Sequence, residues 1–256
     1  MIGTGTDFIL ETRGLVMAYG AFRAVDDVEF RIRRGSIHSV IGPNGAGKTT
    51  LFHCLTGMRR PTAGRILFDG RDITRRAPHT RVDGGMARSF QITTLFQNLS
   101  VSENLRIAAQ GRDSRRALCF WSPVVVSPEQ REFIDGLLDR LGLTARADTI
   151  AGELSHGQQR VLEVGMALAA KPRLLLLDEP TSGMGINDIP MMTRLIGELG
   201  RDHTIVLIEH NMSIVMSISD RVTVMHRGSM LVEGSPAEVR QDARVRAAYL
   251  GQGEAG

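Results

Sequence analysis

The stretch Gly-Pro-Asn-Gly-Ala-Gly-Lys-Thr-Thr at residues 42–50 restricts the possible folds of this chain more than any other feature. It follows a β-leaning run at residues 36–41 and precedes helix-compatible residues 51–55. The glycines let successive backbone N–H groups turn inward, and the start of a following helix adds a positive dipole. A strand, a glycine-rich loop and a helix in this order predict a phosphate-binding loop in an α/β fold.

The side chains at the end of this loop fit the same chemistry. Lys48 would reach the β- and γ-phosphates of a nucleotide as a compact ammonium, and the Thr49 hydroxyl would ligate Mg²⁺. Of the 31 Lys and Arg residues, only Lys48 and Lys171 are lysines, so the rare residue type marks the candidate site. A glycine-rich turn that precedes a lysine by chance is the alternative, and the complete pattern disfavours it.

Composition excludes several other classes of protein. The formal net charge is +3 and the pI is about 9.3, because few side chains titrate between pH 8 and 11; we therefore expect no nucleic-acid partner. The apolar run at 174–177 is far shorter than the roughly 18 residues of a membrane-spanning helix, and the N-terminus shows no secretory signal. Cys54 and Cys119 cannot form a disulfide framework or a metal cage, which fits a reducing cytosol.

The pattern of apolar residues predicts an α/β core that is interrupted by helices. Predicted strands lie at 8–14, 28–32, 36–41, 174–177, 204–208, 221–225 and 230–233. Predicted helices lie at 101–109, 129–141, 158–170, 189–199 and 211–218, with one or two short helices in 236–250. We expect a single domain, 1–256, with a nucleotide-binding core at 1–91 and 169–256 and a helical subdomain at 92–168.

Two acidic residues, Asp178 and Glu179, end the buried strand at 174–177. Carboxylates at the carboxyl edge of a parallel sheet lie where such sheets bind ligands. Asp178 suits Mg²⁺, and Glu179 could orient and deprotonate an attacking water. An acid after a buried strand is by itself more often a cap or turn residue, but the phosphate-binding loop favours the catalytic interpretation.

The sequence Leu-Ser-His-Gly-Gln-Gln at 154–159 resembles the Leu-Ser-Gly-Gly-Gln signature of ATP-binding cassette (ABC) ATPases, and the resemblance covers nearly the whole chain. It implies a P-loop ABC ATPase core with an N-terminal antiparallel β subdomain and an inserted α-helical subdomain. It also implies ATP and Mg²⁺ as ligands. In this family the signature of one subunit closes over ATP held by another, so a head-to-tail pair of identical or paralogous ATPase subunits is implied. Taken alone, Ser155 is a plausible helix N-cap.

The resemblance implies a role for three further residues. Tyr19 corresponds to the aromatic residue that stacks on adenine, Gln91 to the glutamine that contacts Mg²⁺ or water, and His210 to the histidine that contacts the γ-phosphate. Each would otherwise be a structural residue. The predicted catalytic residues are Lys48, Gln91, Glu179 and His210, and the predicted metal ligands are Thr49, Gln91 and Asp178. The predicted nucleotide contacts are Tyr19, Gly42, Pro43, Asn44, Gly45, Ala46, Gly47, Lys48, Thr49, Thr50, Ser155, Gly157 and Gln158.

Two positions depart from the general family pattern. His156 replaces the first signature glycine, and Gly185 stands where the family usually has an aspartate, so Gly185 cannot make that residue's contact across subunits. These features, with Ile-Glu-His-Asn-Met at 208–212 and Ala-Tyr-Leu-Gly at 248–251, resemble ATPases of branched-chain amino acid uptake. Urea and short-amide uptake ATPases share several of them.

The resemblance predicts the energy-coupling subunit of a bacterial inner-membrane importer, bound peripherally at the cytoplasmic face. Its partners would be a second ATPase subunit, two membrane-spanning permease subunits that dock on the helical subdomain and, indirectly, a periplasmic solute-binding protein. Three alternatives stay open. An exporter ATPase can share every motif, a soluble ABC ATPase usually has a long coiled-coil insertion or tandem cassettes, and a non-hydrolysing regulatory module would not need Glu179 and His210.

Overall fold

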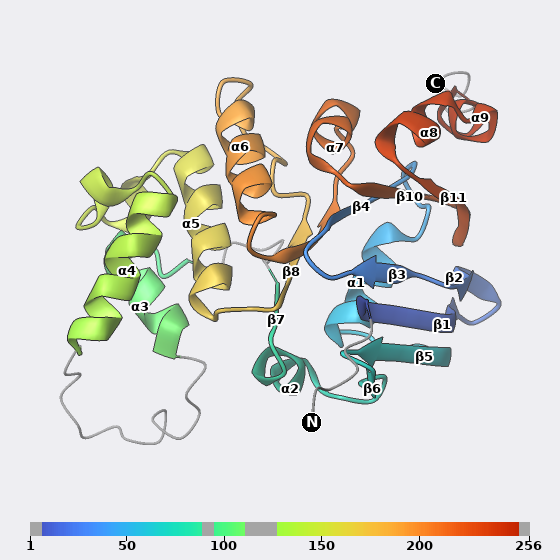
Figure 1. Cartoon of the computed structure of the whole chain (residues 1–256), viewed down its shortest axis with the longest axis horizontal. Coiled ribbons are helices and arrows are strands. Elements are labelled where there is room, and N and C mark those ends of the chain that lie inside the picture. The colour runs from blue at the N-terminus through green and yellow to red at the C-terminus, as the bar shows by residue number, and fades with distance from the viewer. Residues whose placement is uncertain (1–6, 89–94, 111–126, 251–256) are drawn as a thin grey trace. The chain divides into compact units, whose positions relative to one another are not determined.

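The computed structural model describes residues 7–88, 95–110 and 127–250 (Figure 1). It divides into two compact units, Met1–Arg81 with Gly197–Gly256, and residues 82–196. The helices α2 (Pro78–Asp83) and α6 (Ile189–Leu199) run across the two boundaries. The predicted division at residues 92 and 168 follows the motifs rather than compactness, and it stays a prediction.

The first unit contains an antiparallel sheet, as the family resemblance implies. Its strands are ordered β2-β1-β5-β6, and β3 also pairs with β1. Strand β1 continues past the predicted end at residue 14 because Gly14 adopts φ 55° within a bulge, after which pairing with β5 resumes at Val16. The predicted strand at 28–32 is wrong in its bounds, because it joins the last residue of β2 to part of β3. The rest of β2, and β5 and β6, were not predicted. The bounds are β1 Phe8–Tyr19, β2 Phe22–Val28, β3 Arg31–Arg33, β5 Ala63–Phe68 and β6 Arg71–Asp72.

A second sheet in the same unit carries the phosphate-binding loop. Strand β4 (Ile37–Ile41) is parallel to β9 (Thr204–Ile208) and to β10 (Arg221–His226), and β11 (Ser229–Gly234) is antiparallel to β10. All residues of β4 and β9 are buried, as their continuous apolar runs predict. The helices wholly within this unit are α1 Lys48–Thr56, α7 Met212–Ile218, α8 Pro236–Gln241 and α9 Ala243–Leu250.

The second unit contains the inserted helices. Strand β7 (Met86–Arg88), which was not predicted, is parallel to β8 (Leu174–Asp178). Helix α5 approaches its neighbours closely at Gly165, where a Cβ would lie 2.3 Å from Leu141 Cδ1 and 3.1 Å from Leu105 Cδ2. The described helices are α3 Val101–Gln110, α4 Pro128–Arg140 and α5 His156–Ala169, with 3₁₀ turns at Thr144–Arg146 and Ala151–Glu153. The predicted helical insertion is therefore confirmed.

The buried side of α4 is formed by Ile134, Leu137 and Leu138, whereas Phe133 is half-buried. The Lys171 ammonium lies 4.1 Å from the centroid of the Phe133 ring. Lys171 therefore makes a cation–π contact.

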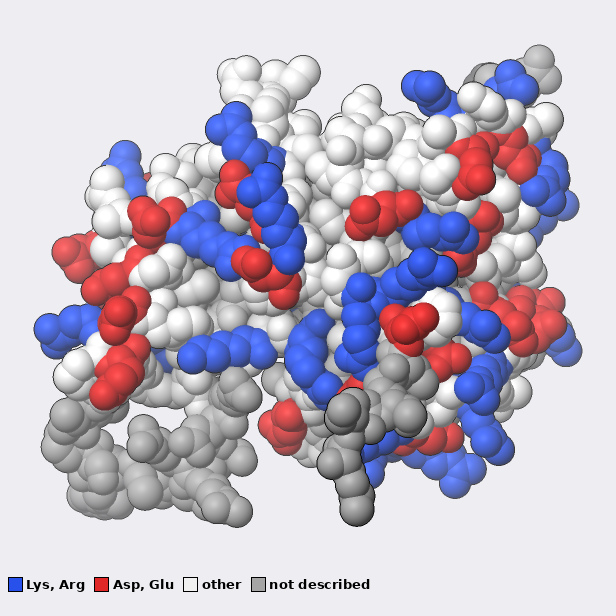
Figure 2. Space-filling model, viewed as in Figure 1, with Lys and Arg blue, Asp and Glu red and all other residues white. Residues whose placement is uncertain are grey.

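Charged side chains of both signs lie on the described part of the face drawn in Figure 2. No helix in the parts of the chain that the structure describes is long and apolar enough to cross a membrane. Acidic and basic side chains are interspersed on the face drawn in Figure 2. Several of them are paired, as in the exposed contact of 2.8 Å between Arg23 and Asp26.

Candidate functional site

The phosphate-binding loop lies between β4 and α1 and needs its glycines. Gly42 has φ 151°, and a Cβ there would lie 2.2 Å from the carbonyl oxygen of Met225 in β10. Gly47 has φ 99°, and a Cβ there would lie 2.2 Å from the carbonyl oxygen of Ala24 in β2. Gly45 has φ 76° with open space around it. Strands β2 and β10 thus hold the two ends of the loop, while its middle is open toward a ligand.

The start of α1 is suited to an anion. Gly47 is the N-cap, no side chain caps the helix, and the first turn contains no acidic residue. The first backbone N–H groups of α1, including those of Thr49 and Thr50, therefore remain available to phosphate oxygens. Lys48 is 7% exposed, and its ammonium donates hydrogen bonds to the carbonyl oxygens of Gly42 at 2.6 Å and Pro43 at 3.0 Å. The loop thus fits the phosphates of a nucleotide.

Two more predicted residues lie in the same unit as the loop. Tyr19 is 47% exposed at the end of β1, so its ring is accessible to a stacking partner. His210 is exposed and directly follows the fully buried Glu209, whose carboxylate accepts the His210 backbone N–H at 3.2 Å. Asn211 then caps α7 by accepting N–H groups of its first turn. The backbone of His210 is therefore held on both sides while its ring faces solvent.

The acidic pair lies in the second unit, at the end of β8. Asp178 is 4% exposed, and its Oδ2 lies 3.5 Å from Nη2 of Arg88, the last residue of β7. Burial lowers the pKa of Arg88, and the charge of Asp178 partly offsets that shift. Glu179 is half-buried and adopts φ 49°, a left-handed conformation that is uncommon for glutamate and is concentrated at functional positions.

Arg88 is a residue that motif reasoning missed. Its position three residues before Gln91, in Arg-Ser-Phe-Gln at 88–91, could have marked it as a candidate. Only the parallel pairing of β7 with β8 shows that its side chain faces Asp178. The predicted ligand Gln91 lies outside the described residues. Among the described residues there is no cluster of three or more His, Cys, Asp or Glu side chains that could hold a metal ion. Mg²⁺ in nucleotide sites does not need such a cluster, because it is typically held by one or two protein oxygens together with substrate phosphates.

The signature residues start helix α5. Ser155 is the N-cap: its Oγ accepts the backbone N–H of Gln158 at 3.2 Å, and Gln158 Oε1 accepts the Ser155 N–H at 3.1 Å. A Cβ on Gly157 would lie 2.5 Å from Oδ2 of Asp188. A Cβ on Gly183 would lie 3.0 Å from His156 Nε2. The signature and the segment after the acidic pair, the two places where the chain departs from the general pattern, are therefore in contact.

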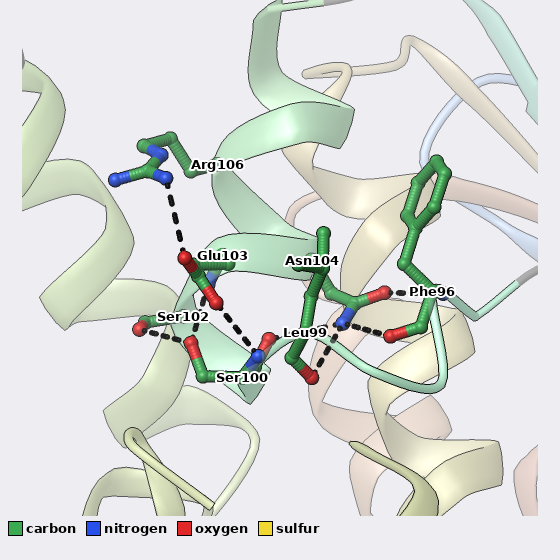
Figure 3. A network of polar contacts seen from close by, with 7 residues as sticks. All are labelled: Phe96, Leu99, Ser100, Ser102, Glu103, Asn104 and Arg106. Carbon is green, nitrogen blue, oxygen red and sulfur yellow. Dashed lines mark hydrogen bonds and ion pairs between the residues drawn. The ribbon is translucent and has the colours of Figure 1, made fainter. Parts of the chain in front are cut away.

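A buried asparagine organises the segment that begins the helical subdomain. Asn104 is fully buried, and its Oδ1 accepts the backbone N–H of Phe96 at 2.8 Å (Figure 3). Its Nδ2 donates to the carbonyl oxygens of Phe96 at 3.2 Å and Ser100 at 2.9 Å. Glu103 completes a capping box with Ser100. This network fixes the loop while the Phe96 side chain stays 47% exposed.

A glycine loop before an uncapped helix, and an acidic pair at the end of a buried strand, define a P-loop nucleotide-binding protein. The chain belongs to the ABC transporter family, since that family's model matches residues 25–182. A second model, described as a branched-chain amino acid ATP-binding cassette transporter, matches residues 229–255.

Individual relatives agree with these matches. The chain is 39% identical to the high-affinity branched-chain amino acid transport ATP-binding protein BraF of Pseudomonas aeruginosa, over 95% of this chain and 98% of BraF. It is 38% identical to LivG of Escherichia coli, of the same description, with the same coverage. It is also 34% identical to the lipopolysaccharide export system ATP-binding protein LptB of Acidithiobacillus ferridurans, over 95% and 97% of the two chains.

Solved structures share the fold. The ADP conformation of MJ1267, an ATP-binding cassette of an ABC transporter, superposes with a TM-score of 0.85 at 32% identity, covering 96% of this chain and all of that one. A nucleotide-free ATP-binding cassette from an ABC transporter gives 0.83 at 31% identity, covering 94% and 98%. The predicted fold class and the assignment to ABC ATPases are confirmed.

Proposed function

We propose that this chain is the ATP-hydrolysing, energy-coupling subunit of an importer for branched-chain amino acids. The observation that carries the ATPase part is the loop at 42–50, with its required glycines, its buried Lys48 and the uncapped start of α1. The solute class is supported by the branched-chain model at residues 229–255 and by the printed descriptions of BraF and LivG.

In this proposal the loop binds the phosphates of ATP. Backbone N–H groups of the loop and of the first turn of α1 surround the β-phosphate, and the Lys48 ammonium exchanges its two carbonyl partners for phosphate oxygens. Tyr19 stacks on adenine. Thr49, Asp178 and Gln91 would hold Mg²⁺, which would neutralise charge on the β- and γ-phosphate oxygens. This grouping rests on the order of motifs in the sequence.

Glu179 is the proposed general base. Its carboxylate accepts a proton from the attacking water as the oxygen of that water forms a bond to the γ-phosphorus and the bond to the ADP oxygen breaks. The left-handed backbone at Glu179 turns the chain directly after β8, and so sets where this carboxylate points. His210 would contact the γ-phosphate from its rigid position before α7.

Two ATPase subunits, identical or paralogous, would share each ATP. Ser155, Gly157 and Gln158 of one subunit would close on the γ-phosphate bound by the loop of the other. The Ser155–Gln158 capping box keeps the start of α5 in one conformation, which is what a repeatedly opening contact requires. Closure and reopening would then drive the membrane subunits at the cytoplasmic face of the membrane.

The helical subdomain is the proposed docking surface for the two permease subunits. The buried Asn104 amide fixes the backbone that presents the exposed Phe96 ring (Figure 3). Aromatic side chains are enriched in protein–protein interfaces, and a fixed backbone lowers the entropy cost of such a contact. A periplasmic binding protein would deliver the solute to the permeases.

Uptake of labelled leucine tests the whole proposal. The chain would be co-expressed with the permeases and the binding protein of a branched-chain amino acid importer, and uptake compared between the wild type and Glu179→Gln. We expect leucine uptake that requires Glu179 and that unlabelled isoleucine or valine suppresses. Suppression by urea or short amides instead would assign the related uptake class. Solute release from the cell would favour export, the direction printed for the relative LptB.

A further inference from the structure

Both ends of the phosphate-binding loop contact the hairpin β10–β11. Gly42 lies so close to Met225 of β10 that no side chain fits between them. At the other end, the backbone N–H of Gly228, in the turn of the hairpin, donates to the carbonyl oxygen of Ala46 at 3.0 Å. The hairpin continues directly into α8 and α9, so the C-terminal segment is joined to the loop through backbone contacts.

Helix α9 and the phosphate-binding loop line the same pocket. A pocket of about 590 Å³ is lined on one side by loop residues 43–46 and on another by Arg244, Ala247 and Ala248 of α9. The next residue, Tyr249, packs against a buried cluster that includes Ile41, the residue before Gly42. The C-terminal helix therefore lies beside the first residues of the loop.

The hydroxyl of Tyr249 has an unusual environment. Its oxygen is buried and makes no hydrogen bond of standard geometry within the described part of the chain. Burial raises the pKa of Tyr249 to about 12, and the neighbouring backbone N–H of Gly42 offsets part of the rise. A phenylalanine would fill the same apolar space without the cost of an unsatisfied hydroxyl. A small shift of the loop would give this hydroxyl a partner, and the backbone N–H of Gly42 is the adjacent donor.

We propose that Tyr249 is a positioning residue for the phosphate-binding loop. Its hydroxyl accepts a hydrogen bond from the backbone N–H of Gly42 when the loop holds a nucleotide, and this contact makes nucleotide affinity depend on the docking of α9. The Gly42 carbonyl is also the closer of the two partners of the Lys48 ammonium, so a shift of this residue changes the lysine that reaches the phosphates. The inference rests on the proposed nucleotide-binding function of the loop.

The segment concerned is also the one that matches the branched-chain family model, residues 229–255. It comprises β11, α8 and α9, and it begins at the turn that contacts Ala46. The proposal therefore gives this segment a role in nucleotide binding: it supports both ends of the phosphate-binding loop.

Equilibrium binding of ADP and ATP to the full chain, measured by calorimetry, tests the proposal with the variant Tyr249→Phe. We expect affinity to fall about three- to tenfold, the effect of one hydrogen bond. The melting temperature should stay equal or rise, because an unsatisfied hydroxyl is removed. In steady-state hydrolysis KM should rise by a similar factor, with kcat within about twofold of the wild type.

Two matched variants separate the possible failures. Arg246→Ala changes an exposed side chain of the same helix and should bind nucleotide as the wild type does. Lys48→Ala should lose most binding if the loop is the nucleotide site. Equal affinity of Tyr249→Phe and the wild type, with Lys48→Ala impaired, would overturn the role of Tyr249 alone. Unimpaired binding by Lys48→Ala would overturn the proposed function of the loop itself.

Discussion

The ammonium of Lys48 lies 2.6 Å from the carbonyl oxygen of Gly42, at the other end of the same loop. Pro43 provides a second carbonyl at 3.0 Å. A buried ammonium without such partners would carry a large desolvation cost. The loop therefore provides oxygen partners for its own lysine, and phosphate oxygens can replace these carbonyls when a nucleotide binds.

Replacement of Lys48 should abolish catalysis without unfolding the chain. For Lys48→Ala we expect ATP turnover to fall by at least about 100-fold, since a charge aimed at the transferred phosphate is lost. For Lys48→Arg we expect a similarly large loss of ATP turnover, because a broad guanidinium does not fit a loop that holds a compact ammonium. Lys171→Ala, which changes the one other lysine, is the control. A phosphate-release assay with near-normal turnover in Lys48→Ala would contradict this role.

The pair of Arg88 and Asp178 should contribute to stability in the absence of metal. Arg88→Met leaves the buried Asp178 carboxylate without its cationic neighbour, and we expect a loss of about 3 kcal/mol in the free energy of unfolding. Urea denaturation in EDTA measures it. Arg106→Ala, which removes an exposed pair with Glu103 at 3.8 Å, should leave the urea midpoint unchanged within error. If both variants unfold at the same urea concentration, Arg88 does not stabilise the acidic pair.

Stability should depend on pH through His38, a buried residue of β4. Burial and the charge of Arg221 lower the pKa of His38 to about 3. The Nε2 atom of His38 lies 2.8 Å from the Thr223 hydroxyl, which in turn donates a hydrogen bond to Glu233. In the unfolded chain the His38 side chain has its ordinary pKa near 6.5, so the unfolded state binds a proton more readily than the folded state does. The contribution of neutral His38 to the free energy of unfolding is therefore complete above about pH 6.5. It is lost as the pH falls toward 3, by up to about 1.4 kcal/mol per pH unit.

Urea unfolding between pH 7 and pH 4 checks this dependence. The variant His38→Gln keeps a hydrogen-bonding group but cannot titrate, so its curve of stability against pH should be flatter than that of the wild type. His79→Gln changes an exposed histidine and should leave the slope intact. Parallel curves for the wild type and His38→Gln would show that His38 does not titrate as described.

Phe96 should matter for assembly and not for folding. Its backbone is held by Asn104, so Phe96→Ala keeps the loop and removes an exposed ring. We expect an unchanged melting temperature and weaker co-purification with the permease subunits. Met58→Ala removes an apolar side chain of similar exposure, 55%, in the first unit and should co-purify normally. Equal recovery of permeases with both variants would place the docking surface elsewhere.

Much of the fold could be predicted because the buried segments have clear periodicity. The helix predicted at 189–199 and the strand at 204–208 agree with α6 and β9 at both ends, since amphipathic spacing and continuous burial leave strong patterns. Short strands could not be predicted. β7 has three residues and β6 two, so neither contains enough residues to show alternation.

The candidate site also contains residues that the sequence could predict and residues that it could not. Lys48 and Asp178 belong to contiguous motifs, so the sequence alone could predict them as site residues, and these roles stay predictions. Arg88, Asp188 and Tyr249 act, in our interpretation, through contacts with residues distant in the chain, and only the pairing of strands and the packing of helices reveals those contacts. The assigned roles of Tyr19, Ser155 and His210 stay predictions, although the structure shows that Tyr19 and His210 are accessible.

The turnover of ATP by Glu179→Gln tests the central claim most directly. With the permease complex present, we predict that the variant binds ATP as tightly as the wild type and hydrolyses it about 100- to 1000-fold more slowly, as expected for loss of a general base. Glu153→Gln, an exposed acid in the same unit, should retain full turnover. Equal rates for Glu179→Gln and the wild type would contradict the proposed mechanism.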